Sequence, residues 1–208
     1  MAHLTYEFVH LPCSKAFEED QKMVLPAFDI MKSENPHPKW TGLQLGAPPE
    51  PTFWNVTAWD SSDAHRAWQS CAIFPSFYSA IIPVVADAAN PRFDFFHSHF
   101  PSDPERALSA PLTQVTLLTP KQGKTRQEIE GLLEKMLGLM KESGAEGVLE
   151  AVVGTIEEHP EKVIVAIGWE SKEHQEKASG PSGPAGHIIK EIDDLAEATS
   201  ANTKFFKH

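Results

Sequence analysis

Three short sequence patterns occur twice in this 208-residue chain, in the same order and at a nearly constant separation. The repeated patterns are Leu4-Thr5 and Leu112-Thr113, Trp59-Asp60-Ser61 and Trp169-Glu170-Ser171, and Phe95-Phe96 and Phe205-Phe206. The first pattern recurs after 108 residues and the other two after 110. Self-similarity at a fixed period is typical of a repeated structural unit. We therefore predict two tandem copies, residues 1–100 and 110–208, joined by the polar, proline-containing segment 101–106.

The second copy predicts the elements of this unit. Residues 112–119 are rich in Thr, Val and Leu, as strands are. Thr125 and Glu128 form a capping-box pattern, and apolar residues then follow helical spacing up to Ser143. We expect strands over 147–156 and 162–169, a helix capped by Ser171, a Gly/Pro/Ser break over 179–186, a helix over 187–198 and a short last strand at 205–206.

The first copy predicts the same order of elements. We expect a strand over 4–11, a helix near 15–32 that Pro26 kinks or shortens, strands near 40–46 and 52–59 around a loop at 46–51, a broken helix over 62–86, and a strand over 92–100. The order β-α-β-β-α-β is that of the ferredoxin-like unit. Such a unit leaves one sheet face uncovered, so two copies can close face to face. The predicted fold is therefore α+β, with a pseudo-twofold barrel inside one chain.

Composition excludes several classes of function. The chain has 18 Lys and Arg against 29 Asp and Glu residues, a net charge of −11 at pH 7. That charge argues against nucleic acid and anionic lipid as partners. The apolar runs are too short to span a bilayer, and the N-terminus lacks the pattern of a secretory signal. Two cysteines, Cys13 and Cys71, are too few for a disulfide framework, so a cytoplasmic location is expected.

One motif resembles that of a known family. The segment Trp59-Asp60-Ser61-Ser62-Asp63-Ala64-His65 resembles the Trp-(Asp/Glu)-Ser-x-(Asp/Glu)-x-His signature of dimeric α/β-barrel proteins, which include the antibiotic-biosynthesis-monooxygenase-like group. The second copy matches through Glu173 and has Gln175 in place of the histidine. The resemblance covers about seven residues in each half, and a chain of this length is similar to tandem fungal members tied to secondary metabolism.

The resemblance implies a fold more firmly than an activity. The implied fold consists of two tandem ferredoxin-like repeats that form a dimeric-α/β-barrel-type core within one chain. Family members include cofactor-free monooxygenases, polyketide cyclases, decarboxylases, haem-degrading enzymes and stress proteins without a known reaction. Haem-degrading members carry an axial histidine on the second helix, downstream of a tryptophan that Trp68 resembles. This chain has Tyr78 near that place instead, so no cofactor is expected.

His65 and His10 are candidates for proton transfer, because imidazole titrates near neutral pH. His65 falls one turn into the helix that follows Ser61, where it acts either as a base or as a structural residue bonded to the strand end. Its expected partner is Asp63 or the neighbouring backbone. His10 lies on the first strand, and some cyclases of the family carry a cavity-facing histidine on that strand.

His97 and His99 form a second candidate pair. Residues two apart in a strand share a face, so both histidines would lie beside Phe93 and Phe95. They can handle a proton at a barrel mouth, ligate a metal or lie at a solvated strand end. No third ligand is visible in the sequence, so no metal is predicted.

Comparison of the copies indicates where a ligand would bind. Asn55, Thr57 and Trp59 share one strand face, whereas their counterparts at 165, 167 and 169 are Val, Ile and Trp. A face that is apolar in one copy and polar in the other indicates a ligand cavity in the first half or, alternatively, an edge exposed to solvent. The aromatic residues Tyr78, Phe95 and Trp40 complete the candidate binding set, so the first half carries the predicted site and the second half is scaffold.

The sequence thus supports three hypotheses. The first is a cofactor-independent enzyme of secondary metabolism that acts on a hydrophobic, aromatic or polyketide-like small molecule by histidine acid/base catalysis. Cyclisation, aldol chemistry, decarboxylation and monooxygenation all fit this hypothesis. The second is a non-catalytic ligand-binding or stress-response protein, and the third is a haem-binding or haem-degrading protein. Because both sheets come from one chain, we expect a monomeric pseudo-dimer or a homodimer.

Overall fold

The computed structural model describes residues 4–46, 50–91, 93–144 and 146–208. The chain forms two compact units: residues 1–97 together with 206–208, and residues 98–205. The boundary therefore lies at Ser98, inside a strand, and not in the segment 101–106. Ser98 and His99 pair with a strand of the second unit, while Phe206 and Lys207 pair with a strand of the first. Residues Ala47 to Pro49 of the predicted loop lie outside the described residues.

The first unit contains most of the elements that its sequence predicts. Their bounds are β1 Thr5–Pro12, α1 Lys15–Glu19, η1 Gln21–Val24, α2 Leu25–Met31, β2 Lys39–Leu45, β3 Thr52–Trp59, α3 Ser62–Gln69, α4 Phe74–Ile81, η2 Ile82–Val84, β4 Asp94–His99 and β9 Phe206–Lys207. The helix expected near 15–32 is divided into three pieces, and Pro26 stands in the first turn of the last one. Proline is tolerated there because the N–H it lacks has no partner inside the helix.

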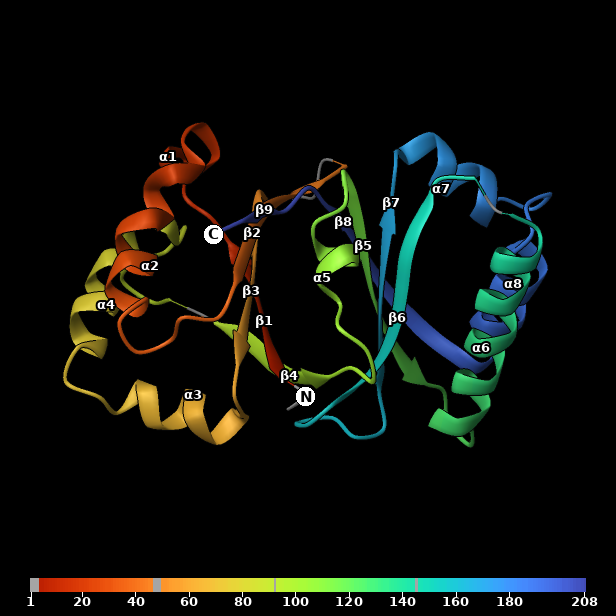
Figure 1. The fold of residues 1–208 in the computed structure, drawn as a ribbon, viewed down its shortest axis with the longest axis horizontal. Helices are drawn as coiled ribbons and strands as arrows, with labels where there is room; N and C mark the ends of the chain where they lie inside the picture. Colours follow the sequence, from red (N-terminus) through yellow and green to blue (C-terminus); the bar gives the residue numbers. More distant parts are fainter. Residues whose placement is uncertain (1–3, 47–49, 92, 145) are drawn as a thin grey trace. The chain divides into compact units, whose positions relative to one another are not determined.

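The strands of the first unit form an antiparallel arrangement in which β3 lies between β1 and β2, and β4 lies beside β1. Glu7 is the register partner of Thr57, and Val9 is the partner of Asn55, so these four side chains share one face. Helices α2, α3 and α4 lie over one side of the strands (Figure 1). The apolar core under these helices includes Phe17, Phe28, Phe53 and Val84.

The second unit repeats this order of elements. Their bounds are α5 Glu105–Leu108, β5 Leu112–Pro120, α6 Arg126–Glu142, β6 Val148–Ile156, β7 Val163–Trp169, α7 Lys172–Ser179, α8 Gly186–Leu195 and β8 Ala196–Thr203. Strand β5 lies between β7 and β8, and β6 lies on the other side of β7. Helices α6 and α8 cover one face of these strands (Figure 1). The capping box at Thr125 is present, with both of its hydrogen bonds to Glu128.

The tryptophan motif has the same local structure in both units. Ser61 accepts a hydrogen bond from the backbone N–H of Ala64, and Ser171 accepts one from the N–H of His174. Each serine therefore caps the helix that follows its strand. The strand registers match as well: Trp59 is the partner of Thr5, and Trp169 is the partner of Leu112. By strand register, Leu112 therefore corresponds to Thr5, whereas the Leu-Thr pattern aligns it with Leu4. The two alignments differ by one residue.

The end of the second unit differs from the prediction. The helix expected over 187–198 ends at Leu195, and β8 begins at Ala196. The sequence did not reveal β8 because its residues, AEATSANT, are small or polar and four of them in a row are exposed. Pairing with β5 over its whole length holds the strand in place. Phe206 consequently lies in β9, which pairs with β2, and does not correspond to a residue of β4.

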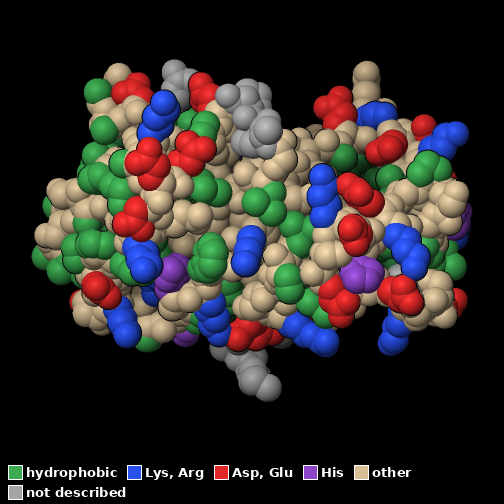
Figure 2. All heavy atoms as spheres, turned by 90° about the horizontal axis from the view of Figure 1, so that it is seen from above, with side chains coloured by type: hydrophobic (Ala, Val, Ile, Leu, Met, Phe, Trp, Pro, Cys, Tyr) green, Lys and Arg blue, Asp and Glu red, His purple; other side chains and the backbone are tan. Residues whose placement is uncertain are grey.

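In the described part of the chain, no helix has both the length and the apolar character needed to cross a membrane. On the face shown in Figure 2, acidic and basic side chains are interspersed with hydrophobic ones.

Candidate functional site

A cavity of about 170 Å³ lies in the first unit between the sheet and its helices. Most of its wall is apolar and aromatic. The residues that line it are Glu7, Val9, Leu11, Phe28, Met31, Phe53, Asn55, Thr57, His65, Trp68, Gln69, Phe74, Phe77, Tyr78, Ile81, Val84, Val85, Phe93 and Phe95. Its carboxyl and imidazole groups are those of Glu7 and His65. An apolar pocket with a few polar groups on one wall is the usual form of a small-molecule site.

Glu7, His65 and His97 form a buried chain of contacts at this wall. The Nδ1 atom of His65 lies 2.8 Å from the Nε2 atom of His97, and its Nε2 atom lies 3.4 Å from Oε1 of Glu7. The other carboxylate oxygen of Glu7 accepts a hydrogen bond of 2.9 Å from the indole N–H of Trp59. All three titratable side chains are at least nine-tenths buried. Solvent therefore screens their interactions weakly.

Local structure places each member of this chain. Because Ser61 starts α3, His65 lies in the first turn of that helix, and its ring stacks on Trp59 with ring centres 4.7 Å apart. Strand β4 brings His97 to the far side of the His65 ring. Glu7 enters from β1, in register with Thr57. Three elements distant in sequence, β1, α3 and β4, thus converge at one wall.

These contacts determine which atoms of Glu7, His65 and His97 donate and which accept hydrogen bonds. With Glu7 ionised, its two oxygens accept from Trp59 and from the Nε2–H of His65, and His97 then donates its Nε2–H to Nδ1 of His65. A proton taken up by Glu7 neutralises its carboxylate, while the N–H groups of Trp59 and His65 keep the side chain oriented. The arrangement is therefore suited to a carboxylate base that two imidazoles and an indole hold in position.

Two polar atoms in the cavity wall have no partner among the described residues. They are the side-chain carbonyl oxygen of Asn55 and the indole N–H of Trp68, both buried. The Asn55 amide nitrogen is already engaged, since it donates to the hydroxyl of Thr57 at 2.9 Å. Buried groups without a partner are costly, so each indicates a position for a ligand atom. Asn55 requires a donor from the ligand and Trp68 requires an acceptor.

The structure brings together most of the residues that the sequence singled out. Asn55, Thr57, His65, Tyr78 and Phe95 all line the cavity. Trp59 and His97 do not line it, but both contact residues that do. The partner expected for His65 was wrong: Asp63 pairs with Arg66 at 2.8 Å, because both lie on the exposed side of α3.

Three predicted site residues lie away from this cavity. His10 and Trp40 are on the opposite face of the strands: His10 stacks on Trp54 at 4.8 Å, and Trp40 packs near Tyr6. Burial lowers the pKa of His10, partly opposed by the negative charge of Asp94.

His99 is the third of these residues. It follows His97 on β4 but belongs to the second unit, where β4 pairs with β6. Its side chain is 48 % exposed and lies 3.3 Å from Glu157. His99 is therefore a surface residue, even though it shares a strand face with His97.

Glu7 and Trp68 are the site residues that sequence reasoning missed. The available signal was Glu7 itself, an acidic residue on the strand face that also carries Val9 and Leu11. A charge on an otherwise apolar face indicates either an edge or a site. The missing hydrogen-bond partner of Trp68 is visible only in three dimensions.

The second unit places amides where the first has titratable groups. The indole N–H of Trp169 donates to Gln114 at 3.3 Å, as that of Trp59 does to Glu7. Gln175, six residues after Trp169, corresponds to His65 and exchanges two hydrogen bonds of 2.9 Å with Asn202 of β8. Asn202 therefore contacts the residue that corresponds to His65, as His97 contacts His65 in the first unit.

Among the described residues, no group of three or more His, Cys, Asp and Glu side chains is arranged to hold a metal ion. Burial, together with the negative charge of Glu18, raises the pKa of the Cys13 thiol to about 11, which disfavours the nucleophilic thiolate at neutral pH.

Comparison with known proteins shows similarity of structure only. No protein-family model and no curated protein matches the sequence. A structure from Fusobacterium nucleatum, provisionally named a monooxygenase, is 10% identical, with a TM-score of 0.68 over 98% of this chain and 93% of that one. A structure from Lactobacillus acidophilus with the same provisional name is 9% identical, with a TM-score of 0.64 over 98% and 94%. An anthrone oxidase-like protein is 12% identical, with a TM-score of 0.66 over 100% and 93%. The fold of this chain is therefore similar to that of these dimeric α/β-barrel proteins.

Proposed function

We propose that this protein is a small-molecule enzyme of the oxidase or monooxygenase type. The observation that carries the proposal is the buried Glu7–His65–His97 chain at the wall of an apolar cavity. A buried carboxylate that two imidazoles hold in position is suited to removing a proton from an apolar molecule. The names of the structural neighbours, monooxygenases and an anthrone oxidase-like protein, support the same class of reaction.

The two unpaired polar atoms support an aromatic substrate with oxygen substituents. A phenol hydroxyl can donate to the carbonyl oxygen of Asn55, and a ring ketone can accept from the indole N–H of Trp68. The aromatic side chains Phe74, Phe77 and Phe95 then contact the ring faces and edges. A hydroxylated, polyketide-like ring ketone has all of these features.

The proposed reaction begins with loss of a C–H proton. Glu7 takes the proton from the carbon opposite the ketone, and the resulting enolate passes electrons to dioxygen, the co-substrate. For an anthrone, insertion of one oxygen atom at that carbon and loss of two hydrogens gives the quinone, and the second oxygen atom leaves as water. The protein supplies the base, the orientation and a site with little water; no step requires a bound cofactor.

Haem does not fit the residues of this cavity. Both ring nitrogens of His65 are engaged, one by His97 and one by Glu7. Tyr78, which stands near the place of the axial histidine in haem-degrading relatives, is 37 % exposed at the side of the cavity. The cavity therefore offers no histidine with a ring nitrogen directed at an iron.

The test is oxygen consumption with 1,8-dihydroxyanthrone as the probe substrate. We expect wild-type protein to consume one O₂ per quinone formed, and Glu7→Gln and His65→Gln to lower kcat by roughly 10²–10⁴-fold, the usual contribution of a general base. His159→Gln is the matched control, because His159 forms an exposed pair with Glu161 on the other unit. His99→Gln is also expected to retain full activity.

Other results would point elsewhere. Tight binding of the anthrone without turnover would favour a ligand-binding protein. Turnover without O₂ uptake, seen as ring closure or loss of CO₂ from an open-chain polyketide analogue, would favour the cyclase or decarboxylase alternatives. Full activity in Glu7→Gln would contradict the proposed base.

We also propose that the two units descend from one duplicated ferredoxin-like unit. The matched registers of Trp59 and Trp169, and the serine caps that follow them, support this origin. An origin by duplication agrees with the proposal that this chain is a tandem-repeat member of the dimeric α/β-barrel superfamily.

A further inference from the structure

We propose that the second unit contains a ligand site of its own, which binds a neutral, apolar small molecule without chemically changing it. The site is a cavity of about 260 Å³ between β5, β7 and β8 on one side and α6 and α8 on the other. No residue of the first unit takes part, so the inference is independent of the oxidase proposal.

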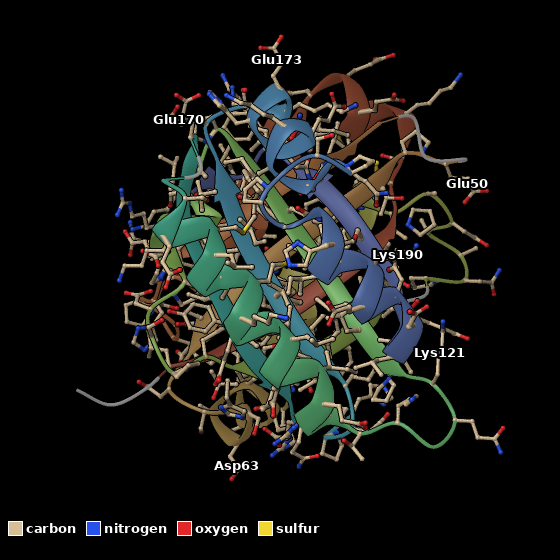
Figure 3. All side chains as sticks on the ribbon, turned by 90° about the vertical axis from the view of Figure 1, so that its right-hand side faces the viewer. Glu50, Asp63, Lys121, Glu170, Glu173 and Lys190 are labelled. Atoms are coloured by element: carbon tan, nitrogen blue, oxygen red, sulfur yellow. The ribbon has the colours of Figure 1, made fainter. Side chains whose placement is uncertain are left out.

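The cavity is enclosed mainly by apolar side chains. Those that define it are Leu118, Met136, Met140, Val165, Ile167 and Ile192, all buried. Figure 3 looks onto α6 and α8, the two helices that cover it. Empty apolar space loses packing contacts that a ligand would restore. Met136 and Met140 have flexible, polarisable side chains that can adjust to the shape of a ligand.

A strip of neutral polar groups crosses the sheet side of the cavity. Gln114 donates to the hydroxyl of Thr116 over 3.4 Å, which is long for a hydrogen bond, and Thr116 contacts the hydroxyl of Ser200 at 2.8 Å. All three line the cavity, as does one charged residue among those described, Asp193 at its exposed side. A ligand hydroxyl or carbonyl can replace the long Gln114 contact. An anionic ligand would find no opposite charge in this wall and would be repelled by Asp193.

The residues of this unit account for binding without reaction. Gln114, Gln175 and Asn202 stand where the first unit has Glu7, His65 and His97. Side-chain amides form hydrogen bonds but do not accept or release a proton near neutral pH. The polar strip of the second cavity, to which Gln114 belongs, thus contains no acid/base group.

The experiment uses the full chain labelled with ¹³C at the methionine methyl groups. Met136 and Met140 line the second cavity, and Met31 lines the first, so each cavity has its own reporter. The probe is N-phenyl-1-naphthylamine, which is neutral and apolar. In NMR spectra of the methyl groups, we expect the probe to cause saturable chemical-shift changes at Met136 and Met140. Its anionic analogue, 1-anilinonaphthalene-8-sulfonate, should bind at this site at least tenfold more weakly.

Two substitutions locate the binding event. Ala198→Trp places an indole at the exposed side of the cavity. We expect it to lower the affinity for the probe, measured from the chemical-shift changes of Met136 and Met140, at least tenfold. Lys190→Trp adds the same ring to an exposed position of α8 outside the lining and should leave them unchanged (Figure 3). If Ala198→Trp fails to fold, Ile189→Trp, the neighbour of Lys190 and a lining residue, serves instead.

Two results would overturn the proposal. One is a chemical-shift change at Met31 alone when the probe is saturating. The other is an unchanged response of Met136 and Met140 in the Ala198→Trp variant. Loss of anthrone oxidation in the first unit would have no bearing on this result, so the two proposals fail separately.

Discussion

Glu7 is held in the wall of the first cavity by Trp59 on one side and His65 on the other. These contacts keep a charged group in an apolar wall. A carboxylate in such a place is stabilised only while its hydrogen-bond donors stay in position. The residue therefore has two roles that substitution can separate: it accepts the Trp59 N–H, and it carries a titratable oxygen.

We expect Glu7→Ala to lower the free energy of unfolding by about 1–3 kcal/mol, because it leaves the buried N–H of Trp59 without its acceptor. Glu7→Gln should cost less, since an amide oxygen accepts the indole N–H of Trp169 in the second unit. Urea denaturation of the two variants measures the difference. Equal losses in both would show that the Trp59 bond contributes little.

Lys39 is a second buried charge of the first unit. Its ammonium group donates to the carbonyl oxygens of Asn35 and His37 at 2.8 Å each. Burial, together with the positive charge of Lys32, lowers the pKa of Lys39 from an ordinary value of 10.5 to about 8. Between these two pH values the unfolded chain holds a proton that the native protein has lost.

The contribution of Lys39 to stability should therefore rise as the pH increases from about 8 to 10.5, because the unfolded state binds more protons there. Lys39→Met removes this dependence. The difference in unfolding free energy between wild type and variant should shift in favour of wild type by up to about 1.4 kcal/mol per pH unit. Denaturation curves at pH 7.5 and 9.5 measure it, and a difference that does not change with pH would contradict the shifted pKa.

At the scale of single elements, local sequence signals decided where helices begin. Ser61, Thr125 and Ser171 each accept a hydrogen bond from a backbone N–H of the helix that follows. The capping box of α6 is the strongest of these signals, because Glu128 also accepts from the backbone N–H and the hydroxyl of Thr125. Those bonds lower the pKa of Glu128.

Thr125→Ala should lower the free energy of unfolding by about 1 kcal/mol, the usual cost of losing a helix N-cap. Thr125→Ser is the matched control and should retain most of the stability, because its hydroxyl can make the same bond to the Glu128 N–H. Thermal and urea denaturation both report the change. A Ser variant as unstable as the Ala variant would mean that the threonine methyl group, and not the cap, matters.

At the scale of the whole molecule, two units share an order of elements but differ in chemistry. The first places Glu7, His65 and His97 in contact, and the second places Gln114, Gln175 and Asn202 at the corresponding positions. Because carboxylate and imidazole groups can exchange protons near neutral pH and amides cannot, we propose the reaction for the first unit and simple binding for the second.

The triple variant Glu7→Gln/His65→Gln/His97→Asn tests this division. It should fold, because the second unit is built with the same three amides, with a loss of roughly 1–3 kcal/mol from the smaller side chain at position 97. It should still bind 1,8-dihydroxyanthrone and show no O₂ uptake. Calorimetry measures the binding and an oxygen electrode the turnover. Oxidation at the wild-type rate would mean that the reaction occurs elsewhere.

The sequence by itself determined the elements with strong local signals. The capped helices α3, α6 and α7, the division of the helical segment at Pro26 and the strands rich in Val, Ile and Trp all follow from residues close together in the chain. It also indicated the first half as the place of a cavity, through Asn55 and Thr57, which line one. The small, polar strand β8 had no local signal, since only its pairing with β5 makes it a strand.

Only the tertiary structure decided which titratable groups meet. Glu7, His65 and His97 come from β1, α3 and β4, and their contact depends on strand register and on the turn at which α3 begins. His97 and His99 look equivalent in the sequence, yet one is buried against His65 and the other pairs with Glu157 on the surface. Periodicity shows which face of an element a side chain occupies, but contact and burial depend on elements far away in the chain.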